Sequence, residues 1–540
     1  MEQPQRRLDR TAKQIFLYLA WLAPCLIILL LVFRHDYTGL YRSDAMDAAQ
    51  LARNISNGRG FTTDFIRPLA LSRHAIAPAA PDLYQPPLYP LALGIIFTVF
   101  PAEDQIVAAA SGFFFLLALL VTFFWAGKMF GRNVAGLATL LLAANLTLLQ
   151  ITVAGAATAL WVLLITLALY LVYRHSGRLR WSFLIGVVFA LCFLTEYLTI
   201  FILPAVIWLL LALLPQRRGA HLAAFLVGAL LAFAPWGIRN YLLAGSPWFS
   251  LRWYTIAMFG GSYPGFSALR ELSLPEGSPL GFILAHPAEM GKKLVLGARG
   301  LYSSLLLLCG PYVAAFFIAG MLHRFNNERV RRLRGAFYAI LLLLVFAAAI
   351  TTGAAESLAP VAPLITILAV AFVEVLLAAR QAGVKQHALA KGLLLIVAGL
   401  PVLINLLVPV ARPAPLRQNL EQVSRIVPRG ALVLSDIPWA VAWYADRTAG
   451  WLPSAPLTKP QERSDPTQTA GFAAIDGPEH RVAAIYLSSR LMAHPAAERL
   501  AGWQALRAAP EGFRLEAVLP GGDVLLLRNN MLRGQQNNNP

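Results

Sequence analysis

Long apolar runs separated by short polar loops dominate the first three quarters of the chain. A helix needs about 17 to 25 mostly apolar residues to cross the roughly 30 Å hydrocarbon core of a bilayer. Runs of about this length predict about eleven spanning helices. Their ranges are 14–34, 105–127, 133–153, 157–174, 181–196, 198–215, 219–238, 300–322, 335–352, 361–379 and 391–411. We therefore expect a polytopic α-helical membrane protein.

The basic loops predict how these helices are oriented. Cytoplasmic loops of membrane proteins carry an excess of Lys and Arg. The basic loops are 127–133, 174–180, 216–221, 323–335 and 380–392. All of them fall on the cytoplasmic side if the amino terminus is cytoplasmic and the short apolar run 88–101 does not span. The length of that run, about 14 residues, suits an interfacial or re-entrant segment.

Three regions then face outward: a first loop (35–104), a second loop (236–299) and everything after about residue 412. The last region contains short strand-like runs at 430–436, 481–489 and 521–529, separated by polar and helix-like stretches. We predict a membrane domain over 1–411, a small α/β domain over 412–530 outside the membrane, and a disordered tail over 531–540.

Composition agrees with this class. The chain is 58% hydrophobic and only 13% charged, which is too little charge to cover a soluble protein of 540 residues. Its formal net charge of +18 is explained by cytoplasmic loops and does not indicate a nucleic-acid partner. The three cysteines (Cys25, Cys192 and Cys309) lie inside apolar runs, so neither a disulfide framework nor a metal-ligand spacing is indicated.

The first outward loop begins with two acids in a short predicted helix that ends near Gly58. Asp44 and Asp47 are one turn apart in GLYRSDAMDAAQLARNISNGRGF, so they share one side of that helix. Two readings are open at this point. The pair can be surface acids near a helix start, where they favour the helix dipole, or functional carboxylates held against the membrane by the segment PDLYQPPLYPLALG that follows.

The order of several motifs along the chain resembles that of a known family. The order of an outward acid, ARNISNGRGF, QPPLYPLALGIIFTVF, a basic FGR turn and APWGIRNYLLAGSPWFS is similar to bacterial membrane glycosyltransferases of the GT-C superfamily. Within that superfamily it resembles the dolichyl-phosphate-mannose-protein mannosyltransferase-like and ArnT-like proteins. The similarity covers roughly residues 10–415.

The resemblance implies a fold and a reaction. It implies many membrane helices with juxtamembrane helices in the first loop, a sugar donor carried on polyprenyl phosphate, and inverting transfer on the periplasmic face. An acid in the first loop is then the general base or orients the acceptor, and by motif position this residue is Asp44. Many relatives have an aromatic residue in place of Asp47. We also predict Tyr84 and Gln85, in the QPP motif, as substrate-binding residues.

The leaving phosphate gains negative charge, so cationic side chains should face it. Arg239, at the outer end of a predicted helix, is the first candidate for a phosphate clamp, since a guanidinium binds phosphate with two parallel hydrogen bonds. An ordinary interfacial arginine is the alternative. Lys292 and Lys293 are secondary phosphate candidates, with contacts to lipid headgroups as the alternative. Asn240 either supports the turn or binds sugar. His286 is a candidate substrate-binding residue, with an ordinary polar role in the loop as the alternative.

The chain departs from the family pattern in two places. The outward loop that usually carries a second acid reads TVAGAATALW here. Glu196 at another outward turn is the candidate replacement, with an ordinary turn carboxylate at the membrane interface as the alternative. An Arg-Tyr pair of the relatives is replaced by Glu356 and Ser357. No Asp-x-Asp metal motif is present in the first loop, so we expect no cofactor and no essential metal.

The expected function is transfer of a sugar from polyprenyl phosphate to a glycan, lipid or protein acceptor at the outer face of a bacterial inner membrane. The expected partners are that donor, the acceptor and membrane lipids. A transporter or lipid-handling protein is the alternative, but transporters tend to show internal repeats and none is evident. A GT-C scaffold without activity is a third reading, favoured by the missing second acid.

Overall fold

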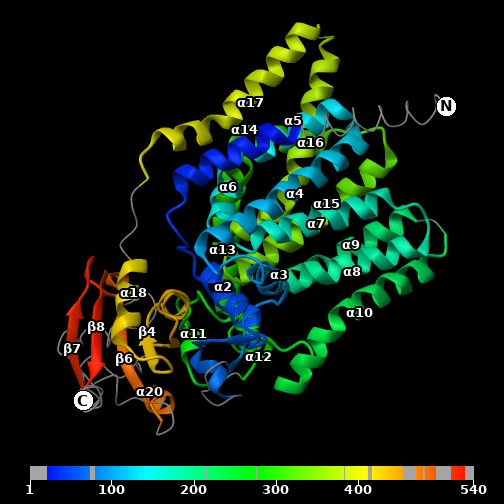
Figure 1. The fold of residues 1–540 in the computed structure, drawn as a ribbon. Coiled ribbons are helices and arrows are strands. Elements are labelled where there is room, and N and C mark those ends of the chain that lie inside the picture. Colours follow the sequence, from blue (N-terminus) through cyan, green and yellow to red (C-terminus); the bar gives the residue numbers. More distant parts are fainter. Residues whose placement is uncertain are drawn as a thin grey trace, which may run out of the picture.

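The computed structural model of the chain consists mostly of helices, and its strands gather near the carboxyl end (Figure 1). It describes residues 21–72, 80–214, 216–274, 277–381, 383–410, 416–453, 470–477, 481–493 and 512–529. The predicted tail 531–540 and residues 14–20 of the first predicted helix lie outside these ranges.

Most predicted spans coincide with one observed helix. These helices are residues 21–36, α4 (Asp104–Phe130), α7 (Thr158–Arg174), α8 (Leu179–Thr195), α9 (Thr199–Leu213), α10 (Arg218–Ala244), α15 (Glu328–Ile350), α16 (Ala362–Ala379) and α17 (Val384–Leu407). Five described helices are long and apolar enough to cross a membrane, or six if a bent pair counts as one span. The total number of spans stays a prediction, because several apolar helices are shorter than 18 residues.

Two predicted spans are broken, so the expectation of one continuous helix in each was wrong. The run 133–153 forms α5 (Arg132–Ala143) and α6 (Leu146–Val153), which are bent by 56°. Asn145 causes the break, since its side chain accepts from Leu148 N and starts a new helix. The run 300–322 is divided between α13 (Pro287–Cys309) and α14 (Pro311–Leu322). Gly310 has φ 76° and the following proline has no N–H, so the first helix ends there.

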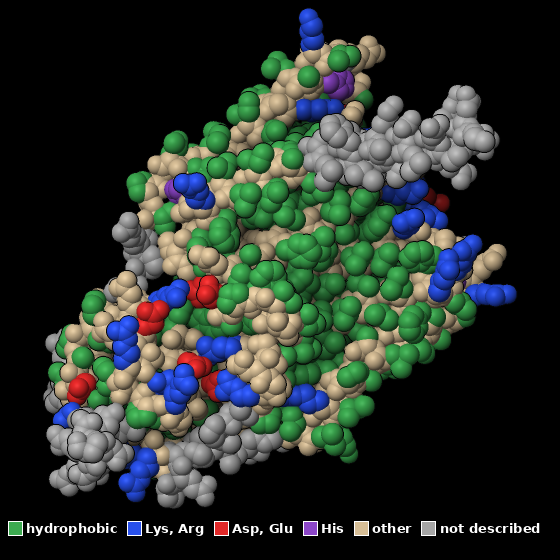
Figure 2. Space-filling model, in the orientation of Figure 1, with side chains coloured by type: hydrophobic (Ala, Val, Ile, Leu, Met, Phe, Trp, Pro, Cys, Tyr) green, Lys and Arg blue, Asp and Glu red, His purple; other side chains and the backbone are tan. Residues whose placement is uncertain are grey.

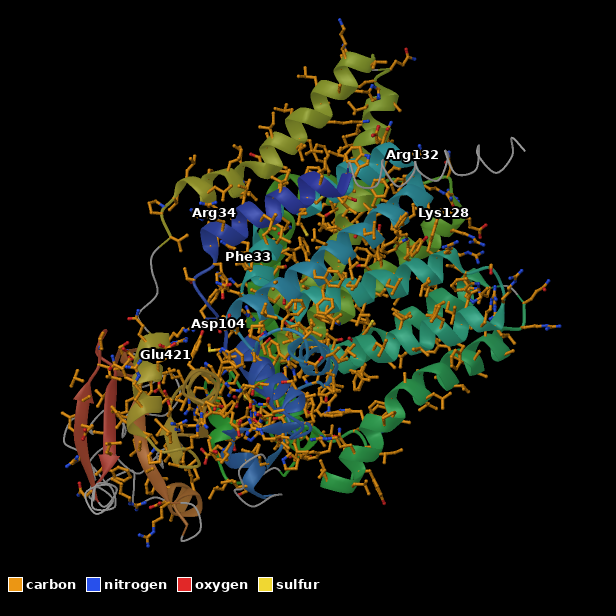
Figure 3. The ribbon with its side chains drawn as sticks, viewed as in Figure 1. Phe33, Arg34, Asp104, Lys128, Arg132 and Glu421 are labelled. Atoms are coloured by element: carbon orange, nitrogen blue, oxygen red, sulfur yellow. The ribbon has the colours of Figure 1, made fainter. Side chains whose placement is uncertain are left out.

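Several of the basic loops meet at one end of the helix bundle. Arg329 Nη1 donates to the Tyr173 carbonyl at 3.2 Å, and the Phe130 and Phe325 rings lie 5.3 Å apart. Arg332 bonds the Ala212 carbonyl. Figure 3 shows α4 running from Asp104, beside the strand-rich part, to Lys128 and Arg132 at the opposite end. Between the two ends, Figure 2 shows a surface dominated by hydrophobic side chains. This arrangement is typical of a helix bundle that crosses a membrane.

The two long loops fold against the other end of the bundle. The first loop contains α2 (Ser43–Ser56), a two-stranded sheet of β1 (Thr62–Thr63) and β3 (Ala80–Pro81), β2 (Phe65–Ile66), η1 (Pro68–Ser72) and α3 (Leu88–Phe97). The second loop contains η2 (Leu251–Ile256), α11 (Ser267–Arg270), α12 (Pro279–Ala285) and the start of α13. η3 (Ala355–Val361) precedes α16.

The carboxyl-terminal part forms a mixed sheet, which confirms the predicted strand-like runs. Its elements are α18 (Leu416–Ile426), β4 (Leu432–Ser435), α19 (Pro438–Ala440), η4 (Val441–Ala445), β5 (Thr448–Trp451), α20 (Ala470–Ile475), β6 (Val482–Leu487), α21 (Ser489–Ala493), β7 (Phe513–Val518) and β8 (Val524–Arg528). The strand order is β2-β5-β4-β6-β8-β7. β2, β5, β4 and β6 run parallel, whereas β8 and β7 are antiparallel to their neighbours.

One strand of this sheet comes from the first loop. Phe65 and Ile66 of β2 pair with Ala449 and Gly450 of β5. The sheet therefore joins the outer loop of the membrane part to the carboxyl-terminal part. The predicted domain boundary at 411/412 stays a prediction, and the sheet crosses it.

Candidate functional site

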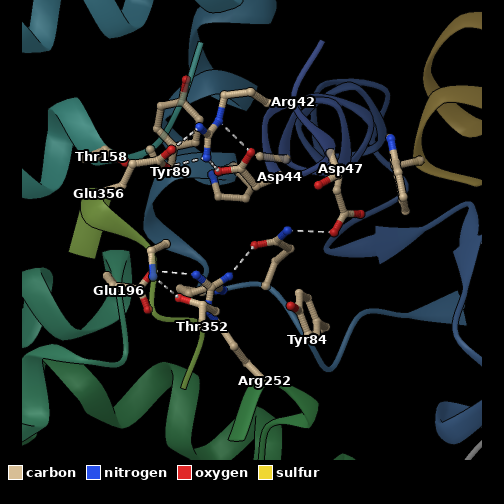
Figure 4. A pocket seen from close by; sticks show the side chains of 18 of the residues that line it. Arg42, Asp44, Asp47, Tyr84, Tyr89, Thr158, Glu196, Arg252, Thr352 and Glu356 are labelled. Carbon is tan, nitrogen blue, oxygen red and sulfur yellow. Dashed lines mark hydrogen bonds and ion pairs between the residues drawn. The ribbon is translucent and has the colours of Figure 1, made fainter. Parts of the chain in front are cut away.

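A cavity of about 370 Å³ lies where the two long loops, the end of α8, η3 and the carboxyl-terminal sheet meet (Figure 4). Its charged lining consists of three arginines and four carboxylates: Arg42, Arg67, Arg252, Asp44, Asp47, Glu196 and Glu356. Of the residues predicted from the sequence, the cavity brings together Asp44, Asp47, Tyr84, Gln85 and Glu196.

Asp44 forms a two-pronged ion pair with Arg42. The Arg42 Nε and Nη2 atoms each lie 3.0 Å from an Asp44 carboxylate oxygen. Burial would raise the pKa of Asp44, but the charges of Arg42 and, at longer range, Arg252 outweigh burial and lower it. Asp44 is therefore ionised at neutral pH. Its side chain is 39% exposed and lines the cavity, so a substrate can reach it.

Asp47, one turn further along α2, is only 2% exposed. Its Oδ2 accepts from Arg67 Nη2 at 2.5 Å and from Gln85 Nε2 at 2.6 Å. Arg67 also reaches Asp82 Oδ1 at 3.2 Å, and its guanidinium lies 4.1 Å from the centres of the Phe65 and Tyr84 rings. These contacts use Asp47 to hold the first loop together. A catalytic role for Asp47 stays a prediction.

Burial raises the pKa of Asp82, with the nearby Asp47 charge adding to the effect and Arg67 opposing it. Its Oδ2 accepts from the backbone N–H groups of Tyr84 and Gln85 at 3.0 and 2.6 Å. Asp82 was not among the residues predicted from the sequence. Its contacts fix the backbone that places Tyr84 and Gln85 on the cavity wall.

Arg252 is a cavity arginine that the sequence analysis missed. Its Nη2 lies 2.5 Å from Glu196 Oε2, and its Nη1 lies 3.5 Å from Gln85 Oε1. The preceding Ser250 caps η2 by accepting from Arg252 N at 3.1 Å, and Leu251 N donates to the Leu83 carbonyl at 2.9 Å. The second loop is thereby fixed along the first. In the sequence, Arg252 is one basic residue in a long loop, which is a weak signal.

Glu356 lies on the cavity wall opposite α2, in η3. It bonds Arg42 with both carboxylate oxygens, one of them 2.5 Å from Arg42 Nη2. Arg42 therefore bridges two carboxylates: Asp44, two positions away in the chain, and Glu356, 314 positions away. In the sequence, Glu356 is only a departure from the family pattern. The structure places this acid beside Asp44.

Arg239 and Asn240 do not line this cavity. Arg239 Nη2 donates to the carbonyls of Asp82 and Phe61 at 2.8 and 3.2 Å, and its guanidinium lies 4.5 Å from the Trp236 ring centre. Asn240 is buried, and its Nδ2 donates to the Phe249 carbonyl at 3.1 Å. In this structure both side chains fasten the end of α10 to the outer loops, so the predicted phosphate clamp lacks a place at the cavity.

Lys292, Lys293 and His286 also lie outside the cavity lining. Lys293 is buried, and its Nζ donates to the carbonyls of Thr255, Ile256 and Met258 at 3.0, 2.9 and 2.5 Å. All three ammonium protons are thus used to hold the end of η2. Lys292 is exposed, and His286 precedes α13 with its ring 4.6 Å from that of Phe282.

The carboxyl-terminal part contributes Trp439 and Trp451 to the lining. It is fixed beside α2 by Arg53, whose Nη1 and Nη2 donate to the carbonyls of Trp443 and Ala442 at 2.9 and 2.7 Å. The cavity is therefore incomplete without this part of the chain. Among the residues that the structure describes, no group of three or more His, Cys, Asp or Glu side chains could hold a metal ion.

Comparison with known proteins gives a family match over part of the chain and a shared fold. Residues 84–238 match the model of the dolichyl-phosphate-mannose-protein mannosyltransferase family. No curated protein sequence matches the chain.

Two solved structures share the fold over most of the chain. One is ArnT from Cupriavidus metallidurans, bound to undecaprenyl phosphate, which is 13% identical and has a TM-score of 0.58. The match covers 95% of this chain and 99% of that one. The oligosaccharyltransferase AglB from Archaeoglobus fulgidus, in complex with an inhibitory peptide and a dolichol-phosphate, is 14% identical, with a TM-score of 0.57 and coverage of 96% and 75%. The chain is a multi-pass membrane protein with the GT-C fold, which confirms the predicted fold class and resemblance.

Proposed function

We propose that the chain is an integral-membrane glycosyltransferase that transfers a sugar from a polyprenyl-phosphate donor, with inversion, in the cavity described above. The observation that carries the proposal is the convergence of arginines and carboxylates at the outer end of a GT-C helix bundle. The family match over residues 84–238 and the lipid phosphates in the ArnT and AglB structures support the donor class.

Arg252 and Arg42 are the proposed partners of the donor phosphate, in place of the predicted Arg239. Both guanidiniums line the cavity and are now neutralised by carboxylates of the protein. A phosphate can accept the guanidinium hydrogen bonds that Glu196 and Glu356 accept in this structure. As the leaving group it gains negative charge, so these hydrogen bonds strengthen in the transition state. Arg239, by contrast, donates from Nη2 to two backbone carbonyls and from Nη1 to Asn240 Oδ1.

Asp44 is the proposed acceptor-binding carboxylate. It is ionised and reaches the cavity, so it can accept the proton of an acceptor hydroxyl while that oxygen bonds to the anomeric carbon. The bond from the anomeric carbon to the phosphate oxygen breaks, and polyprenyl phosphate leaves with the electron pair. Glu196 and Glu356 are the proposed replacements for the second acid of the relatives, because both line the same cavity.

The proposal also covers the sugar, the acceptor and the orientation in the membrane. The sugar is a hexose or a pentose, and the acceptor is a glycan, lipid or protein. The membrane is the bacterial inner membrane, with the cavity and the carboxyl-terminal part in the periplasm and the amino terminus in the cytoplasm. The gathering of the basic loops at the opposite end supports this orientation.

Native mass spectrometry of the purified protein with undecaprenyl phosphate tests the donor site. We expect the wild type, Asp44→Asn and Arg239→Lys to retain the lipid, whereas Arg252→Ala loses at least about tenfold in affinity, as expected for a charge-assisted contact to phosphate. Glu328→Gln, at an exposed ion pair far from the cavity, is the control. Absence of lipid binding by the wild type would contradict the proposed function.

A further inference from the structure

A group of aromatic side chains from three separate parts of the chain forms another part of the cavity lining. Phe65 comes from the first loop, Phe266 from the second, and Trp439 and Trp451 from the carboxyl-terminal part. The Trp451 ring centre lies 5.3 Å from Phe65, 5.7 Å from Trp439 and 5.6 Å from Phe266. We call these four residues the aromatic wall.

The sheet topology explains why the two tryptophans meet there. Trp451 is the last residue of β5, and Trp439 follows β4, whose Ser435 pairs with Trp451. Both are thus placed by the carboxyl ends of neighbouring parallel strands. Open α/β sheets bind ligands outside the carboxyl ends of their strands, and here the two tryptophans at that edge line the cavity.

The Trp451 side chain carries a hydrogen-bond donor without an acceptor. Trp451 is 3% exposed, and its Nε1 atom is buried with no partner among the described residues. Buried polar groups nearly always find a partner, and leaving one unpaired is costly. Since Trp451 lines the cavity, a ligand oxygen inside it can supply the missing acceptor.

The charges next to the aromatic wall decide which ligand it suits. The Arg67 guanidinium lies 4.1 Å from the Phe65 ring centre, and that of Arg270 lies 4.5 Å from the Trp451 ring centre. These cations disfavour an ammonium ligand, which aromatic cages otherwise bind. A neutral ring with an apolar face and hydroxyl groups fits both the aromatic surface and the free donor.

We propose that the aromatic wall is a saccharide subsite, in which a sugar ring stacks on the partly exposed Trp439 and a sugar hydroxyl accepts a hydrogen bond from Trp451 Nε1. This inference rests on the proposed function and extends it to the carboxyl-terminal part of the chain. The sugar is that of the lipid-linked donor or that of a carbohydrate acceptor, and the two sources are separated by experiment.

The test uses the full chain in detergent and two variants. Trp451→Phe removes the donor and keeps a ring, and Trp439→Ala removes one stacking surface. Trp208→Phe, on α9 and outside the cavity lining, is the matched control. Affinities are measured for undecaprenyl phosphate and for undecaprenyl phosphate glucose and mannose, and each protein is also applied to a glycan array.

If the wall holds the donor sugar, the wild type binds a sugar-bearing lipid about tenfold more tightly than the bare lipid, and Trp451→Phe abolishes the difference. If it holds an acceptor sugar, the lipids bind alike in all proteins, and saccharide binding on the array is lost in both variants. Variants that match the wild type in both assays overturn the inference. If the wild type binds none of the lipids, the proposed function fails, and the array alone still decides whether the wall binds saccharides.

Discussion

Asp44 and Asp47 show how strongly surroundings decide what a carboxylate does. The two residues lie one turn apart on α2, yet one reaches the cavity and the other is 2% exposed and bonded to Arg67 and Gln85. A sequence alone treats them as a pair. Their different burial predicts different effects of mutation on the stability of the fold.

Asp47→Ala is expected to destabilise the fold, because it leaves the Arg67 and Gln85 donors buried without this acceptor. Removing one partner of a buried ion pair costs about 3 to 5 kcal/mol, and Asp82 keeps part of the Arg67 interaction. Thermal unfolding, followed with a thiol-reactive dye on the three buried cysteines, should show a midpoint several degrees lower. Asp44→Ala is the matched variant and should unfold close to the wild-type temperature. Equal midpoints for the two variants would contradict this division of roles.

Arg42 is expected to set the pH range in which Asp44 works. Arg42 lowers the pKa of Asp44, so the carboxylate stays ionised down to acidic pH, and activity that depends on it is lost only below that lowered pKa. In Arg42→Met, the charge that opposes the effect of burial on the pKa of Asp44 is gone, so this pKa rises. The acid limb of the pH–rate profile, measured at saturating donor, should therefore move to higher pH. Arg429→Gln, an exposed arginine of the carboxyl-terminal part, should leave the limb in place. An unmoved limb in Arg42→Met would show that another group controls it.

At the scale of elements, α8 and α10 pack through glycines. A Cβ atom on Gly186 would lie 2.0 Å from the Phe225 carbonyl oxygen, and one on Gly228 would lie 2.2 Å from that of Phe183. Small residues let membrane helices approach closely. The sequence contains both glycines within apolar runs, but it does not reveal that they face each other.

Gly186→Val is therefore expected to separate α8 from α10 and to lower the unfolding temperature in detergent. Because Glu196 ends α8, donor binding should weaken as well. Gly219→Ala, in the first turn of α10, has open space around the added Cβ and should be neutral or slightly stabilising, since alanine favours helix. The same midpoint for both variants would argue against close packing of the two helices.

At the scale of the whole molecule, Asp104 joins the helix bundle to the carboxyl-terminal part. Its carboxylate accepts from Trp443 Nε1 at 2.6 Å and from the Tyr444 hydroxyl at 2.8 Å. It also accepts from Leu40 N at 3.3 Å. Together with β2 and Arg53, these bonds hold the sheet that completes the cavity.

Asp104→Ala should loosen this connection, because it leaves buried donors on both sides without their acceptor. Hydrogen exchange should then show faster exchange in η4 and β5, and sugar transfer should fall while insertion into the membrane is unchanged. Glu103→Gln, at the exposed neighbouring residue, is the control. Unchanged exchange in Asp104→Ala would mean that β2 and Arg53 are sufficient to hold the carboxyl-terminal part in place.

The sequence by itself determined the membrane class, most helix positions and the strands of the carboxyl-terminal sheet, and it predicted a role for Asp44. These follow from local patterns: apolar runs long enough to span, short β-rich runs, and an acid in a polar loop after the first helix. Such patterns depend on neighbours in the chain, which a sequence displays directly.

Tertiary structure alone decided which residues share the cavity. Arg42 and Glu356 are separated by 314 positions, and Trp451 reaches Phe65 only because β2 pairs with β5. Arg239 and Arg252 look alike in a loop sequence, but backbone carbonyls surround the first, whereas the second faces carboxylates on the cavity wall. Charge and residue type are local properties, but burial and interaction partners depend on contacts between distant segments. These contacts determine which cation or carboxylate is accessible to a substrate.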